Sequence, residues 1–201
     1  MRYLTVYETD QEILQAMSDI HLRGSWYDAD ITYSKGNFYM DKQPKIKTDL
    51  IPLLPDVVKD DAQELKTFPM VCRVNSIVFD PPFLFRDRVA VNNDKICARF
   101  SYFKSYEELQ VMYKNSMKCI YEKLADKGYL FFKCQDMTDG KFYCTHNFII
   151  NFAQEIGFEL RDIFLKFNKH KLQADAKQQN CGAKVHSYWI VFKKQRGPTN
   201  E

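Results

Sequence analysis

Residues 75–83 read Asn-Ser-Ile-Val-Phe-Asp-Pro-Pro-Phe, an apolar run that ends at an acid followed by two prolines. A short apolar run bounded by turn residues is typical of a buried β-strand. Proline has no backbone N–H and cannot continue a central strand, so the strand must stop before Pro81. Each proline also fixes its own φ angle. We therefore predict a strand that carries a rigid turn, Asp-Pro-Pro-Phe at 80–83, at its carboxyl end.

Helical and strand patterns alternate on both sides of this strand. Apolar residues recur at helical spacing in three segments, each ending near a glycine: 10–22, 105–127 and 145–156. Short apolar runs predict further strands at 29–33, 45–50, 129–134, 158–167 and 187–194. This alternation indicates an α/β sheet with helices on both faces. The last two strands have no helix between them and are expected to pair antiparallel. We predict one domain over residues 1–194 and a polar tail over 195–201.

The composition excludes several classes of protein. With 45% hydrophobic and 27% charged residues among 201, the chain is expected to fold rather than to be disordered. No apolar run approaches the ~20 residues of a membrane span, and the N-terminus lacks an apolar signal segment. The six cysteines include no Cys-x-x-Cys pair and no Cys–His cluster at zinc spacing. We therefore expect a cytoplasmic protein without membrane contact, metal site or disulfide framework.

Acidic and small residues follow four candidate strand ends, where open α/β sheets bind their ligands. Residues 30–36 read Asp-Ile-Thr-Tyr-Ser-Lys-Gly, a small-residue turn that lets backbone amides approach a ligand. Asp49 is placed to accept hydrogen bonds from ribose hydroxyls, although a lone Asp is also a common turn former. Asp61, followed by Ala62, is placed to accept a hydrogen bond from an adenine amino group.

The turn at 80–83 is the most specific of these strand ends. The Asp80 carboxylate and a proline carbonyl can both accept from an exocyclic amino group, while the Phe83 ring stacks on the base that carries it. The alternative is that the prolines only terminate an edge strand. The apolar strand before them favours the functional interpretation.

These four segments, in this order, resemble the S-adenosylmethionine-dependent amino methyltransferases. Members of that family carry an Asp/Asn-Pro-Pro-Tyr/Phe motif and methylate exocyclic nitrogens of bases, especially N6 of adenine. The resemblance covers about residues 10–194. It implies a Rossmann-like, seven-stranded, mostly parallel sheet with an antiparallel last strand, which agrees with the pairing expected from the pattern. It also implies S-adenosyl-L-methionine as the cofactor.

Carried over residue by residue, the resemblance divides the site into two parts. The residues expected to bind the cofactor are Asp30, Thr32, Tyr33, Ser34 and Gly36 for the methionine part, Asp49 for the ribose, and Asp61 and Ala62 for the adenine. The residues expected to act on the target amino group are Asp80, Pro81, Pro82 and Phe83. Ser34 replaces the first glycine of the family's cofactor loop, which is tolerable only if its backbone needs no positive φ. No segment is long enough to be a separate target-recognition domain, so loops must select the substrate.

Basic residues suggest where a nucleic acid would lie, since a net charge of only +3 requires a local basic face. Arg86 and Arg88 follow the Asp-Pro-Pro-Phe turn among aromatic residues, and Lys184 and His186 end a second basic segment. Ordinary surface lysines with core aromatics explain each segment equally well. We place N6 of adenine in DNA first, ahead of an RNA base. Protein side-chain methylation and a non-catalytic binding module remain alternatives, and a homodimer or a separate specificity partner is compatible with the small size.

Overall fold

The structure is a computed structural model that describes residues 2–69, 73–85, 103–168, 182 and 184–195. Its centre is an eight-stranded sheet with the order β1-β9-β10-β6-β5-β2-β3-β4. The strands are β1 (Val6–Tyr7), β2 (Ala29–Asp30), β3 (Ile46–Asp49), β4 (Val58–Lys59), β5 (Val74–Phe79), β6 (Leu124–Cys134), β9 (Phe158–Phe167) and β10 (His186–Lys194). A separate hairpin pairs β7 (Met137–Asp139) with β8 (Lys141–Tyr143).

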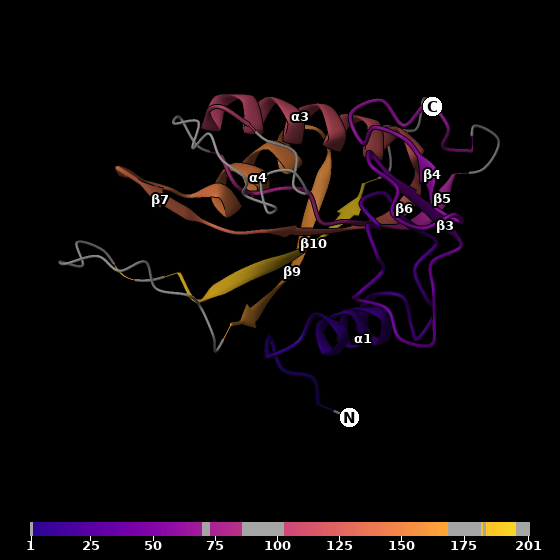
Figure 1. The fold of residues 1–201 in the computed structure, drawn as a ribbon. Helices are drawn as coiled ribbons and strands as arrows, with labels where there is room; N and C mark the ends of the chain where they lie inside the picture. Colours follow the sequence, from indigo (N-terminus) through magenta and orange to yellow (C-terminus); the bar gives the residue numbers. More distant parts are fainter. Residues whose placement is uncertain (1, 70–72, 86–102, 169–181, 183, 196–201) are drawn as a thin grey trace, which may run out of the picture.

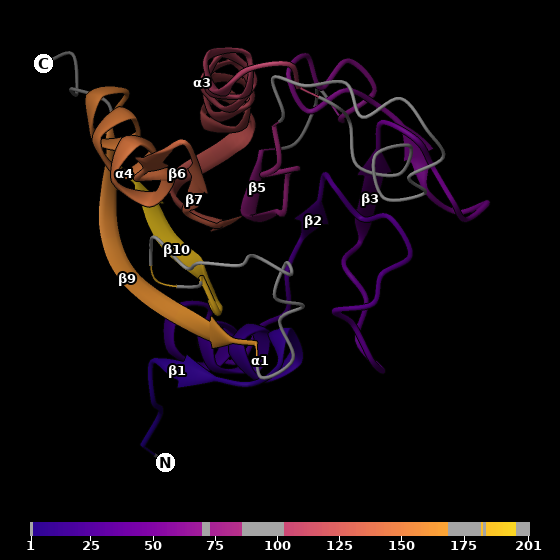
Figure 2. The same ribbon diagram turned by 60° about the vertical axis from the view of Figure 1, so that its left-hand side comes forward.

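Helices cover both faces of the sheet, as predicted. The helices α3 (Tyr106–Lys123) and α4 (Thr145–Glu155) lie on one face, and α1 (Asp10–His21) lies on the other (Figure 1; Figure 2). Neighbouring residues of one strand serve opposite cores, because side chains alternate between the faces of a sheet. In β6, Phe132 is buried in the core under α3 and α4, whereas Phe131 is buried in the core over α1. Among the described residues, no helix has the length and apolar character to cross a membrane.

The predicted fold class is confirmed, and the antiparallel pairing of the last two strands with it: β10 runs antiparallel to both β9 and β6. The strand count differs, with eight strands in place of seven. The two-residue strands β1 and β4 are too short to leave a periodic pattern in the sequence. The strand expected at 29–33 already ends at Asp30, because the Asp30 carboxylate accepts the Thr32 N–H and turns the chain.

The boundary between α3 and β6 also differs from the prediction. The capping box opens the helix as expected, with the Ser105 side chain accepting from the Glu108 N–H. The helix ends at Lys123 instead of near Gly128, because Leu124 is extended, buried in the core and paired with Val74 of β5. Burial of Leu124 thus overrides the glycine signal.

Parallel pairing places the functional segments at one edge of the sheet. β2 pairs parallel with β3 and β5, and β5 pairs parallel with β6. The carboxyl ends of these strands therefore meet, and each end carries an aspartate: Asp30, Asp49, Asp80 and, two residues beyond β6, Asp136.

Phe132 tests how far the core under α3 holds this sheet together. Its ring is fully buried and packs edge-on against Phe79 at 4.9 Å and Tyr113 at 5.5 Å. We expect Phe132→Ala to lower the free energy of unfolding by about 3–5 kcal/mol, measured by urea denaturation. Phe142→Ala is the matched control: that ring is 54% exposed, and its loss should cost at most about 0.5 kcal/mol. Equal losses in the two variants would contradict this packing.

Candidate active site

Two cavities share a wall at the carboxyl edge of the sheet. The larger has a volume of about 520 Å³ and the smaller about 300 Å³. The residues that line both are Thr32, Ser34, Lys35, Asp80, Pro81 and Pro82. A molecule in one cavity and a molecule in the other would therefore meet at the Asp-Pro-Pro-Phe turn.

The larger cavity collects most of the residues predicted to bind the cofactor. Asp49, Asp61 and Ala62 line it together with Thr32 and Ser34. Leu50, Ile51, Leu53 and Met112 add apolar walls. Its volume lies in the usual range for small-molecule sites, which are mostly apolar with a few placed polar groups.

Carboxylates hold the loop at 30–36, which follows β2 and borders the larger cavity. Asp30 is 1% exposed; it accepts the Thr32 N–H at 2.8 Å and the Tyr39 hydroxyl at 2.8 Å. Asp49 Oδ2 accepts the Ser34 N–H at 2.8 Å. Asp30 and Gly36 line neither cavity. They hold the shape of the loop instead, Asp30 through its hydrogen bonds and Gly36 through its positive φ.

Ser34 was expected to replace a glycine only if its backbone had no positive φ, and it does have one. Its φ is +53°, in the left-handed region that favours glycine. Gly36, two residues on, has φ +66°, and a Cβ there would lie 2.3 Å from the Tyr33 hydroxyl oxygen. The serine at position 34, where the resemblance would place a glycine, therefore has a strained backbone. The hydrogen bond from Ser34 N to Asp49 compensates for this strain. Tyr33 itself lines the smaller cavity and stacks on Tyr39 at 5.6 Å.

Asp80 combines a fixed backbone with an unsatisfied side chain. Its N–H donates to Thr32 Oγ1 at 2.7 Å, and its Oδ2 lies 3.5 Å from Lys133 Nζ. Its Oδ1 is buried and has no hydrogen-bond partner within the described part of the chain. Burial raises the pKa of Asp80, and the Lys133 ammonium opposes that rise. A buried acceptor without a donor costs free energy, so this atom marks a place where a donor is expected.

Lys133 belongs to a buried charge network that was not predicted from the sequence. Its ammonium lies 3.1 Å from Asp10 Oδ1, and Asp10 also accepts from Lys166 Nζ at 2.6 Å and from the Trp189 indole at 2.9 Å. Burial lowers the pKa of Lys133, but Asp80 and Asp10 outweigh burial, and the net shift is upward. A lysine inside the apolar run Leu-Phe-Phe-Lys-Cys at 130–134 is the sequence signal that could have pointed to this network.

The two prolines present their carbonyls differently. The Tyr113 hydroxyl donates to the Pro82 carbonyl at 2.8 Å. No donor to the Pro81 carbonyl is found among residues whose placement is described. Phe83, half-buried, lines the smaller cavity beyond the prolines.

Of the four residues predicted to bind substrate, two lie in the described part of the chain. Arg86 and Arg88 lie outside the described residues. Lys184 and His186 line neither cavity; His186 Nε2 lies 3.0 Å from the Tyr188 hydroxyl instead. The lysines that line the smaller cavity are Lys35, Lys133 and Lys166, which were not predicted as site residues.

The burial of Asp30 should make the stability of the fold depend on pH. Burial is the main influence that raises its pKa from 3.8 to about 7. The folded protein thus keeps a proton that the unfolded chain has lost, and the stability contributed by Asp30 falls as pH rises from about 4 to about 7.

We therefore expect Asp30→Asn to gain stability relative to the wild type across that window, by up to roughly 4 kcal/mol, measured by urea denaturation at a series of pH values. The amide can still accept the Thr32 N–H. Asp126→Asn, at a side chain 55% exposed, should run parallel to the wild type. A parallel curve for Asp30→Asn as well would show that the carboxyl is ionised throughout.

Comparisons with known proteins address the fold. No protein-family model matches the sequence, and a search among curated proteins finds no match. Solved structures do match, at low identity. TrmN from Thermus thermophilus is 12% identical over 92% of this chain and 48% of its own, with a TM-score of 0.50. An rRNA methylase from Streptococcus thermophilus is 14% identical over 90% and 96%, with a TM-score of 0.49.

A candidate DNA modification methylase, also from Thermus thermophilus, is 16% identical over 71% of this chain and 55% of its own, with a TM-score of 0.48. The chain thus spans about half the length of that protein. These identities bear on the fold alone. The likeness to TrmN shows that this chain shares the Rossmann-like α/β fold of that protein.

Proposed function

We propose that the protein is an S-adenosylmethionine-dependent methyltransferase that acts on an exocyclic amino group of a nucleic-acid base, with N6 of adenine in DNA as the target. One observation carries this proposal. Two cavities meet at Asp80–Pro82, and the Asp80 Oδ1 atom on their shared wall is a buried acceptor that no described residue satisfies.

The larger cavity fits the cofactor. The carboxylate of Asp49 lines it and retains lone pairs for ribose hydroxyls beyond the backbone N–H groups that it accepts. Asp61 provides a second acceptor, and Leu50, Ile51 and Leu53 provide apolar surface for a base. When bound, S-adenosylmethionine supplies a methyl group on a positively charged sulfur.

The smaller cavity would hold the target base. An aromatic amino group is a poor nucleophile, because its lone pair is delocalised into the ring. Asp80 Oδ1 and the Pro81 carbonyl would accept its two N–H bonds and draw the nitrogen toward tetrahedral geometry, which localises the lone pair. Phe83 would stack on the ring. Catalysis then comes from positioning and electrostatics.

Asp80 would also receive the proton that the amino group loses on methylation. Burial raises the pKa of Asp80, which makes the carboxylate a better proton acceptor. Lys133, at 3.5 Å, opposes that rise in pKa and so favours the ionised carboxylate. The nitrogen would gain a bond to the methyl carbon as the bond from that carbon to the cofactor sulfur breaks, with its electron pair left on sulfur, and the nitrogen's proton would pass to Asp80 or to water.

A base inside a duplex cannot reach this turn, so it must be flipped out of the stack. The charges around the smaller cavity support a nucleic acid as the carrier of the amino group. Lys35 is exposed and lines both cavities, whereas Lys166, which lines the smaller one, is already paired with Asp10.

Substitution of Asp80 tests the proposed chemistry. We expect Asp80→Asn and Asp80→Ala to lower transfer of labelled methyl from S-adenosylmethionine at least ~100-fold, while cofactor binding, measured by calorimetry, stays within a few-fold of the wild type. Matched pools of duplex DNA, RNA and protein serve as acceptors. Asp126→Asn, at an exposed side chain near the start of β6, is the control and should transfer normally.

Each outcome of that assay has a meaning. Label in DNA that digests to N6-methyladenine supports the full proposal. Label confined to RNA or protein would support a methyltransferase but contradict DNA as its substrate. Wild-type turnover by Asp80→Ala would exclude Asp80 from the chemistry.

Salt dependence tests the nucleic-acid part separately from catalysis. We expect the affinity for duplex DNA, measured by fluorescence anisotropy, to fall roughly 10- to 40-fold between about 50 and 200 mM salt if two or three phosphates are contacted. Lys35→Gln should lower the logarithmic salt slope by about one. Lys45→Gln, an 80% exposed lysine just before β3, is the control and should leave the slope unchanged. An affinity independent of salt would contradict phosphate contacts.

A further inference from the structure

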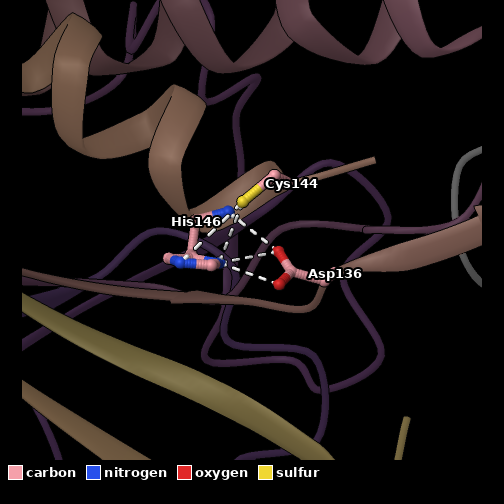
Figure 3. Close-up of side chains that lie close together, drawn as sticks. All are labelled: Asp136, Cys144 and His146. Atoms are coloured by element: carbon pink, nitrogen blue, oxygen red, sulfur yellow. Dashed lines mark hydrogen bonds and ion pairs between the residues drawn. The ribbon is translucent and has the colours of Figure 1, made fainter. Parts of the chain in front are cut away.

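A second cluster of chemically active side chains lies where β6 ends and α4 begins. The hairpin of β7 and β8 brings its two flanks together, because Met137 pairs with Tyr143 at its base. Asp136 and Cys144 are the next residues outward on the two flanks, so the hairpin sets them opposite each other. The first turn of α4 adds His146, and Figure 3 shows the three side chains converging.

The donor atoms of the cluster lie close together. His146 Nδ1 lies 2.9 Å and 2.8 Å from the two carboxylate oxygens of Asp136, and 3.7 Å from the sulfur of Cys144. One ligand atom from each residue lies within 4.8 Å of the others. The same ring nitrogen is thus the nearest one to both neighbours, at hydrogen-bond distance from the carboxylate, so an ion bound by all three residues would replace that hydrogen bond and move the nitrogen and the carboxylate slightly apart.

Surrounding groups fix the ligands and leave a route to solvent. Asp136 is buried and accepts from the Tyr188 hydroxyl at 3.2 Å, which orients its carboxylate. The Tyr188 ring stacks on the His146 ring with centroids 4.4 Å apart. His146 keeps 28% of its side chain exposed, so an ion can enter. Hydrogen bonds to ligands from outside the site are typical of metal centres.

We propose that Asp136, Cys144 and His146 bind a divalent transition-metal ion, with zinc the best match. Thiolate, imidazole and carboxylate together suit zinc and not magnesium or calcium, which prefer oxygen ligands. Three protein ligands leave the fourth tetrahedral position for water. On binding, the metal replaces the proton shared by His146 and Asp136, and the Cys144 thiol loses its proton to solvent.

The proposed metal site does not include Lys133, Asp10 or Lys166, whose charges act on Asp80. It does lie near the Asp-Pro-Pro-Phe turn. Tyr143, next to Cys144, has its ring 4.8 Å from Phe85, two residues beyond the Asp-Pro-Pro-Phe turn. A bound metal would clamp the base of the hairpin that carries Tyr143. No metal site is expected from the sequence, because Asp136, Cys144 and His146 follow no common zinc-ligand spacing.

The test uses the full chain, stripped with a chelator, and titrated with Co²⁺ and then with Zn²⁺ in competition with a chromophoric chelator. We expect a thiolate-to-cobalt charge-transfer band and one tight zinc equivalent in the wild type. Cys144→Ser should abolish the band and weaken zinc binding at least tenfold, and His146→Gln should weaken it similarly. Cys119→Ser is the matched control, because Cys119 is a half-buried thiol outside the cluster.

The outcomes separate cleanly. Zinc binding by Cys144→Ser equal to that of the wild type, or a cobalt spectrum without the thiolate band, would overturn the proposal. Far-UV circular dichroism of the metal-free variants checks that they fold, and His146→Gln keeps the test decisive if Cys144→Ser does not. The readout involves no methyl transfer, so the result is independent of the proposed enzymatic function.

Discussion

Lys133 places a charge inside an apolar strand, and the rest of the site depends on how that charge is compensated. An isolated buried ammonium would cost several kcal/mol. Asp10 at the start of α1 and Asp80 at the end of β5 supply the compensation, at 3.1 and 3.5 Å. One lysine therefore forms ion pairs with both carboxylates. The same charge helps to hold α1 on the sheet, through Asp10, and sets the electrostatics of the Asp-Pro-Pro-Phe turn, through Asp80.

The two carboxylates around Lys133 are not equivalent. Asp10 accepts from Lys133, Lys166 and Trp189, and these partners outweigh burial and lower its pKa. Asp80 has one charged partner and an unsatisfied Oδ1, and its pKa is raised. A fully bonded carboxylate stabilises the fold, whereas a partly bonded one keeps an acceptor available. This difference leaves an acceptor at the end of β5, which the proposed methyl transfer would use.

Local signals in the sequence predict the large elements and miss what depends on distant contacts. The apolar run at 75–79 and the capping box at Ser105 follow from patterns within a few residues, and the antiparallel last strands follow from the lack of a helical pattern between them. The pattern around Asp10 predicts only a helix start, because its partner Lys166 is 156 residues away in the chain. The strands β1 and β4 are two residues long and exist only through pairing with β9 and β3. Asp136, Cys144 and His146 meet because of the hairpin of β7 and β8. The Asp139-Gly140 pair at its tip is a hairpin turn signal, but the flanking strands are only three residues long each and were not predicted.

The loop at 30–36 shows how carboxylates replace glycines in this chain. A left-handed conformation at a non-glycine residue costs about 1–2 kcal/mol, and Ser34 adopts one. A hydrogen bond to a charged acceptor contributes about 1.5–3 kcal/mol, and Asp49 accepts one from the Ser34 N–H. The two terms are of similar size, so the loop keeps its shape without the glycine. Because the carboxylate that holds the loop also lines the larger cavity, the strain and the binding surface depend on the same side chain, and removal of Asp49 would disturb both together.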